Sequence, residues 1–265
     1  MAEPVLYQHD GRVAHIVLNR PNTRNALSLD VVEGLINALE RAHGDETVSC
    51  VVLSGAGKGF CSGGNLQEIR AMTADQHMSE AEIENWYHSG IQRIPLTLHS
   101  IDVVTIAAVH GHAIGAGCDL AAMCDLRIAA EDASFAESFL RVGIIPGDGG
   151  GWFLPRLIGM ARTREMLFTA AGIKAGKALD WGLVSQVVPA EDLIPAALAM
   201  AREIAGLPPG ALRKAKQLMR AVEETGLPEH LLQAATAQGQ LQQLDDHREA
   251  IDAIVEKRVP QFKGR

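Results

Sequence analysis

Two short stretches of small residues have the composition of a site that binds a negatively charged oxygen. They are GKGFCSGGNL (57–66) and GHAIGAGCDL (111–120). Gly64 and Ala116 stand just before helical patterns, where small side chains leave backbone N–H groups open to a ligand. Two converging N–H groups form an oxyanion hole, which stabilises negative charge that develops in a transition state. Taken separately, each stretch is also explained by glycines that permit a tight turn.

Neither stretch fits a nucleotide-binding loop. A P-loop requires G-x-x-x-x-G-K-[ST], but Gly59 follows Lys58 where a hydroxyl side chain is needed. The dinucleotide pattern G-x-G-x-x-G fails at Leu120, which stands where the last glycine is required. Both kinds of phosphate-binding loop are therefore excluded.

The histidines and cysteines are weaker candidates for chemistry. His110 and His112 form an H-x-H at a strand end, which is a weak metal signal because no further ligands accompany it. Cys61 has no evident base to activate it as a nucleophile. The four cysteines show no C-x-x-C pair and no ligand-like spacing. This usage predicts reduced, buried thiols in a cytoplasmic protein.

The chain around these residues alternates between strand, small-residue loop and helix. Continuous apolar runs predict strands that are covered on both faces and lead into the two small-residue stretches. Ser28 is predicted to cap a helix whose apolar residues recur at helical spacing over residues 29–39. This order favours stacked ββα turns over a simple doubly wound sheet. The predicted strands lie in residues 5–19, with a hairpin turn at Asp10-Gly11, and in 48–55, 103–111 and 124–135.

Helical patterns dominate the chain from about residue 191, with glycine and proline at 206–210 and 226–228. Such a helical tail folds back on its own core or packs against neighbouring subunits. No low-complexity linker separates it from the preceding residues. We therefore predict a core over residues 1–195 and a helical oligomerisation region over residues 196–265.

Composition limits the partners of the protein. The 265 residues carry a formal net charge of −8, which argues against general nucleic-acid or membrane-surface binding. The most apolar tract, residues 103–130, is interrupted by charged side chains and histidines, so it does not have the pattern of a membrane-spanning helix. The opening residues MAEPVLYQHDGRV lack a secretory signal, which supports a cytoplasmic location.

Four motifs occur in order along the chain: GFCSGGNL, GHAIGAGCDLAAMCDLRIA, VGIIPGDGGGWFLPRLIG and ALDWGLVSQVVP. Together they resemble those of the crotonase superfamily, the enoyl-CoA hydratase/isomerase family. The resemblance runs from about residue 5 to the C-terminal KRVPQFKGR. It implies an α/β fold, a crotonase-type spiral of ββα turns with a C-terminal helical trimerisation region. It also implies self-association as a homotrimer or a dimer of trimers.

The resemblance assigns a role to both small-residue stretches. In the family, the carbonyl of an acyl-CoA thioester lies between two peptide N–H groups, which here belong to Gly64 and Ala116. These donors stabilise a thioester enolate, and each such donor contributes about 3 kcal/mol to lowering the barrier. The two stretches would together form one oxyanion hole. No metal or redox cofactor is implied, because coenzyme A enters as part of the substrate.

The segment RPNTRNALSLDVV resembles the part of the family that binds the CoA nucleotide. The resemblance places Arg24 near the phosphates and the backbone of Ala26 and Leu27 against the adenine. A basic residue suits this position because the ligand carries several negative charges. A solvated loop arginine is the alternative interpretation. Further candidates for this charge are Lys257, Lys263 and Arg265.

The proton-transfer residues depart from the family's pattern. Its hydratases hold a water between two glutamates, but this chain has Asp119 at the first position and Phe139 at the second. Branches that isomerise, dehalogenate or cleave carbon–carbon bonds place an aspartate in a PGDG-type loop, which implies Asp148 as acid/base and Asp119 as its partner. Asp119 is also explained as a helix cap, and Asp148 as a stabiliser of its turn. Glu137 is a nearby alternative that we expect to face solvent.

The resemblance implies hydration or double-bond isomerisation of an enoyl-CoA, in fatty acid metabolism, with proton transfer by Asp119 and Asp148. One alternative is a hydrolase of a carbon–carbon or thioester bond, in which Asp148 positions the water. Another is a noncatalytic acyl-CoA-binding protein that has kept the oxyanion hole and lost the glutamate pair.

Overall fold

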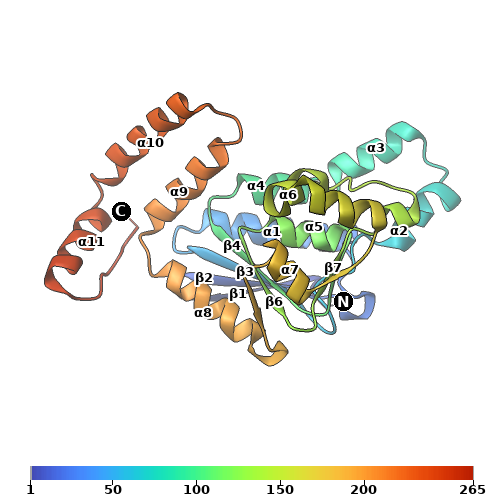
Figure 1. Cartoon of the computed structure of the whole chain (residues 1–265), viewed down its shortest axis with the longest axis horizontal. Helices are drawn as coiled ribbons and strands as arrows, with labels where there is room; N and C mark the ends of the chain where they lie inside the picture. Colours follow the sequence, from blue (N-terminus) through green and yellow to red (C-terminus); the bar gives the residue numbers. More distant parts are fainter. Residues whose placement is uncertain (1, 265) are drawn as a thin grey trace.

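A six-stranded sheet forms the centre of the computed structural model, which describes residues 2–264 (Figure 1). Residues 1 and 265, the outer ends of the two predicted regions, lie outside the described residues. All neighbouring strands of this sheet run parallel except the N-terminal hairpin. In spatial order the strands are β1 (Val5–Asp10), β2 (Val13–Leu18), β3 (Cys50–Gly55), β4 (Val104–Val109), β6 (Leu126–Ala130) and β9 (Gln186–Val188).

A smaller sheet lies beside the first and contains β5 (His112–Ile114), β7 (Ser134–Ala136) and β8 (Ile173–Lys174). After β4, and again after β6, the chain leaves the large sheet, adds a strand to the small sheet and then forms a helix. This repeated order makes the ββα turns that the sequence predicts.

Helices cover both faces of the large sheet (Figure 1). Alternate residues of each strand point to opposite faces, so Val51 joins the core formed with α1, α4 and α5, while Cys50 and Val52 join the core formed with α8. Helix α6 is kinked at Gly159. The helices of this part are α1 (Leu29–Gly44), α2 (Leu66–Arg70), α3 (Glu80–Ser89), α4 (Arg93–Ser100), α5 (Ala116–Met123), α6 (Gly150–Thr169), α7 (Ala175–Trp181) and α8 (Leu193–Ala205).

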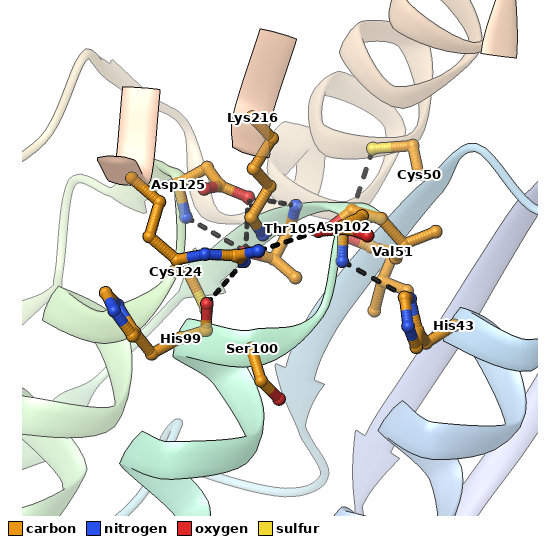
Figure 2. Close-up of polar contacts among 12 residues, drawn as sticks. His43, Cys50, Val51, His99, Ser100, Asp102, Thr105, Cys124, Asp125 and Lys216 are labelled. Carbon is orange, nitrogen blue, oxygen red and sulfur yellow. Dashed lines mark hydrogen bonds and ion pairs between the residues drawn. The ribbon is translucent and has the colours of Figure 1, made fainter. Parts of the chain in front are cut away.

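Three C-terminal helices extend away from the sheets: α9 (Pro209–Ala221), α10 (Leu227–Leu241) and α11 (Asp245–Glu256) (Figure 1). Polar contacts attach α9 to the rest of the protein. The ammonium group of Lys216 lies 2.7 Å from Asp125, whose carboxylate also accepts hydrogen bonds from Thr105 (Figure 2). The guanidinium of Arg220 lies 3.0 Å from Asp102.

The predicted boundary at residue 195 falls inside α8, which packs on the large sheet and not with α9–α11. The division into a core and an oligomerisation region stays a prediction. Within residues 2–264, no helix combines the length and the apolar character needed to cross a bilayer.

Candidate active site

The two small-residue stretches meet at the C-terminal ends of two central strands of the large sheet. They follow β3 and β4, which are parallel neighbours, so both leave the sheet at the same end. The Cys61 N–H donates to the His112 carbonyl at 3.0 Å, and the Ile114 N–H donates to the Cys61 carbonyl at 3.1 Å. A Cβ on Gly63 or Gly117 would overlap a backbone oxygen of the facing stretch. The glycines therefore allow the close contact that joins the stretches.

The N–H groups of Gly64 and Ala116 are open to a ligand. Among residues 2–264, neither donates a hydrogen bond to a protein acceptor. Ala116 is the first residue of α5, and the first N–H groups of a helix have no acceptor within it. Gly115, which precedes it, has a φ of 52° that favours glycine. The structure thus places both predicted oxyanion-hole residues with free donors.

Both residues line one cavity of about 190 Å³. Apolar and aromatic side chains from α2, α3 and the segment before α6 form most of its wall. Asp148 is the one charged side chain among the described residues that line it, and it is 3% exposed. The apolar wall includes Leu66, Ile69, Trp86, Tyr87, Ile91, Phe139, Val142 and Ile144.

Two further buried carboxyl groups, of Asp119 and Glu137, interact with Asp148 without lining the cavity. Asp119 is 0% exposed, and Glu137 is 1% exposed. The expectation that Glu137 faces solvent is therefore wrong. The helix-cap explanation of Asp119 also fails, because Asp119 lies within the first turn of α5 and neither of its oxygens has a donor. A Cβ on Gly150, at the start of α6, would overlap the Asp119 carboxyl group.

These surroundings disfavour ionisation of all three carboxyl groups at once. Burial raises the pKa of Asp119, Glu137 and Asp148, and it brings that of Glu137 to about 7. The charges of Asp148 and Glu137 raise the pKa of Asp119 further. If all three groups were ionised, both oxygens of Asp119, both of Glu137 and one of Asp148 would lack a donor. A proton on Asp119 lets it donate to its neighbours.

The sequence matches the family model described as enoyl-CoA hydratase/isomerase over residues 8–265. The chain belongs to the enoyl-CoA hydratase/isomerase family. A probable enoyl-CoA hydratase of Mycobacterium tuberculosis is 35% identical over 263 residues, which are 99% of each chain. The 2,3-dehydroadipyl-CoA hydratase of Escherichia coli is 35% identical over 96% of each chain. A solved enoyl-CoA hydratase structure from Bacillus anthracis is 35% identical, with a TM-score of 0.92, and the match covers 99% of this chain and 100% of that chain.

Membership of the enoyl-CoA hydratase/isomerase family confirms the predicted α/β crotonase-type fold and makes the protein an enzyme of that family. The overall fold of this enzyme matches that of a protein named as an enoyl-CoA hydratase. Phe139, at the position where the sequence analysis expects the second glutamate of the family, is a wall residue of the cavity.

The segment predicted to bind CoA in this enoyl-CoA hydratase/isomerase family member runs beside the first stretch. The Leu27 N–H donates to the Gly63 carbonyl at 2.8 Å, and the Ala26 N–H donates to Thr23. Arg24 is exposed, and within residues 2–264 its guanidinium makes no hydrogen bond or ion pair. Sequence reasoning missed Asn25. Its buried side-chain amide donates hydrogen bonds to the carbonyls of Ala56, Gly59 and Phe60, which lie in or just before the first stretch. Its φ of 55°, which Asn tolerates, was not readable from the sequence.

The remaining candidates take packing positions. His110 bonds the Gly57 carbonyl at 3.0 Å, and the ring of His112 packs against Gly59. All four cysteines are free and buried, as predicted. Burial raises the pKa of Cys61 to about 12, which leaves it a neutral thiol and a poor nucleophile. Of the predicted C-terminal cations, Arg265 lies outside the described residues.

Proposed function

We propose that the enzyme adds water across the double bond of a 2-enoyl-CoA thioester. The observation that carries this proposal is that two free N–H groups, of Gly64 and Ala116, share one cavity with a single carboxyl group, of Asp148. The N–H groups bind the thioester oxygen, which becomes negative as the enolate forms. The names of the relatives from Mycobacterium tuberculosis and Escherichia coli, both hydratases, support this reaction class.

Asp148 transfers the proton in this proposal. Its carboxylate takes a proton from water as the water oxygen bonds to the β-carbon and the electron pair of the double bond moves to the thioester oxygen. The protonated Asp148 then gives a proton to the α-carbon, and the thioester carbonyl reforms. Asp119 does not line the cavity, so it acts on the reaction through its contact with Asp148 and not by touching the substrate.

Double-bond isomerisation is a second candidate reaction, and one specific observation favours it. Among the described residues, Asp148 is the one carboxyl group that lines the cavity. A single carboxylate is sufficient to remove a proton from the α-carbon of a 3-enoyl-CoA and return it to the γ-carbon. The same oxyanion hole would stabilise the intervening dienolate.

The acyl group is proposed to be uncharged at its far end. Among the residues that line the cavity within the described chain, no Lys, Arg or His is present, and the one charge, on Asp148, would repel a carboxylate. A terminal carboxylate, as in the substrate named for the Escherichia coli relative, would have no counter-ion here. We therefore expect an alkyl or aryl 2-enoyl-CoA.

Arg24 is proposed to bind the phosphates of CoA, since its guanidinium is free and its backbone carbonyl accepts a hydrogen bond from Ser62, which lines the cavity. The backbone of Ala26 and Leu27 would then contact the adenine. Coenzyme A is part of the substrate, and the proposed reaction uses no metal or redox cofactor. We further propose a cytoplasmic enzyme of fatty acid metabolism that assembles as a homotrimer or a dimer of trimers.

Turnover of CoA thioesters, followed by mass spectrometry, tests this function. The panel contains crotonyl-CoA, longer and aryl 2-enoyl-CoA, a 3-enoyl-CoA, a β-ketoacyl-CoA and 2,3-dehydroadipyl-CoA. We expect a product heavier by one water with CoA attached, and strong loss of turnover in Asp148→Asn. The matched control is Asp180→Asn, which alters an exposed aspartate on α7.

Other products would overturn the proposal in distinct ways. Free CoA or a cleaved acyl chain would identify a hydrolase, in which Asp148 positions water. Binding of the thioesters without turnover would identify a noncatalytic acyl-CoA-binding protein. Preferred turnover of 2,3-dehydroadipyl-CoA would contradict the uncharged acyl group.

A further inference from the structure

Glu137 is a buried acid for which the proposed reaction has no use. It follows β7, where the Ala136 carbonyl accepts a 2.7 Å hydrogen bond from the Gly115 N–H. This bond fixes Glu137 behind the second small-residue stretch. Its side chain is 1% exposed and does not line the cavity, and neither of its oxygens has a donor among the described residues. Burial of an unpaired carboxylate is costly, so this position requires an explanation.

The groups that face Glu137 supply no positive charge. Cys118 and Asp119 face it from the first turn of α5, and Asp148 acts on it from the loop before α6. No cation of the described chain forms an ion pair with it. Two groups can donate to Glu137: the thiol of Cys118, which is a weak donor, and the carboxyl proton of Asp119. The Asp119 proton can also go to Asp148.

A carboxylic acid has one O–H and donates one strong hydrogen bond at a time. Asp119 therefore has two competing acceptors: Asp148, which lines the cavity, and Glu137, which does not. When Asp119 donates to Asp148, that carboxylate is stabilised and becomes a weaker base. When Asp119 donates to Glu137, Asp148 keeps its full basicity.

We propose that Glu137 is a positioning residue that draws the Asp119 hydrogen bond away from Asp148 and so sets the basicity of Asp148. This inference rests on the proposed function, in which Asp148 is the group that contacts the substrate. Protonation of Glu137 reverses the effect. A protonated Glu137 becomes a donor to Asp119, and the Asp119 proton then turns to Asp148.

The pH dependence follows from the chemistry of Glu137. Its pKa is raised from 4.5 to about 7, first by burial, so it is ionised above that pH and neutral below it. We expect kcat to fall as pH decreases through about 7, because the weakened Asp148 base removes protons more slowly. A change of one pKa unit in the base changes the rate by up to about tenfold.

The test compares pH profiles of kcat and KM for the wild type, Glu137→Gln and Glu131→Gln. A glutamine mimics the protonated acid, because it is neutral and its amide donates to Asp119. We expect Glu137→Gln to lose about tenfold in kcat above neutral pH, to lose the limb near pH 7, and to keep its KM. The control alters an exposed glutamate and should retain the wild-type profile. If kcat of Glu137→Gln still falls as the pH decreases through about 7, the inference is overturned.

A second measurement separates this inference from the proposed reaction. Carboxyl ¹³C NMR titration of the wild type and Glu137→Gln needs no substrate. We expect one carboxyl step near pH 7 in the wild type, coupled to a second group, and its loss in the variant. If Glu137→Gln does not fold, Glu137→Asp replaces it and should shift that step without removing it. If Glu137 ionises at its ordinary pKa, the inference is contradicted. If the wild type shows the carboxyl step near pH 7 but has no activity on the CoA thioesters, only the proposed reaction is refuted.

Discussion

Gly150 shows how strongly the buried carboxyl cluster depends on one absent side chain. The Asp119 carboxyl group occupies the space where a Cβ of residue 150 would stand. A protein interior is closely packed, so Asp119 can accommodate a methyl group only by moving. The position of the cluster is thus coupled to the start of α6.

We predict that Gly150→Ala displaces Asp119 and lowers kcat by about a hundredfold, since a misplacement near 1 Å has effects of that size. The overpacking should also reduce the free energy of unfolding by about 1–3 kcal/mol. Gly151→Ala is a matched control, because the nearest atom to its new Cβ is 4.0 Å away. Steady-state kinetics and urea unfolding of both variants decide the matter. Equal behaviour of the two would contradict the packing argument.

Ala116 permits a direct test of a backbone donor. It is the first residue of α5, a position where proline fits a helix without removing an intrahelical hydrogen bond. Ala116→Pro deletes the N–H group, and we predict a loss of about 10²–10³ in kcat. Ala116→Ser retains the N–H and should stay within about tenfold of the wild type. Far-UV circular dichroism checks the helix in both, and full activity of the proline variant would remove Ala116 from the oxyanion hole.

The sequence indicated Gly64, Ala116, Asp119 and Asp148 as candidates, because small-residue loops and their adjacent carboxylates occur in recognisable motifs; their roles stay predictions. It failed for Glu137. The direction of that side chain depends on how the end of β7 is bonded to Gly115, a contact between distant residues. In such an irregular segment no periodicity indicates which side chains face inward.

At the scale of elements, the sequence indicated where strands and helices occur more completely than it indicated which elements pack together. The buried strands β3 and β4 were evident because both faces of each are covered, which requires a continuous apolar run. The small sheet was not recognised, since β5, β7 and β8 are too short to show an alternating pattern. Helix α8 resembles the later helices in composition but packs on the large sheet, as only the tertiary contacts reveal.

The attachment of α9 depends on Lys216, whose side chain is 13% exposed beside Asp125. We predict that Lys216→Met lowers the free energy of unfolding by about 2 kcal/mol, because it removes charged hydrogen bonds to Asp125 and to the Val103 carbonyl. Lys214→Met on the same helix is the control, as Lys214 makes no ion pair within residues 2–264. Urea unfolding measures the loss, and limited proteolysis should cleave the region of α9–α11 faster. Equal stability of both variants would argue against this attachment.

At the scale of the whole molecule, α10 and α11 expose an apolar surface that the rest of the described chain does not cover. Leu231 and Leu232 are 57% and 69% exposed, and Ile254 and Val255 are 74% and 75% exposed. Exposed apolar area of this extent is typical of an interface between subunits. It agrees with the proposed trimer.

We predict a trimer or a hexamer in light scattering coupled to size-exclusion chromatography. Leu232→Glu should shift the population toward the monomer, because a buried unpaired carboxylate destabilises an interface. Gln238→Glu introduces the same charge at an exposed polar position of α10 and should leave the mass unchanged. A monomeric wild type would contradict the prediction.

The hydrogen bonds between Cys61 and the segment of His112 to Ile114 also have a consequence for how the protein folds. They join residues that are about fifty positions apart, so their formation must overcome a large loss of chain entropy. Individual helices can form earlier, from local contacts alone. During refolding, recovery of helical circular dichroism should therefore precede recovery of activity, and the interval between them would measure the time needed to bring the two stretches together.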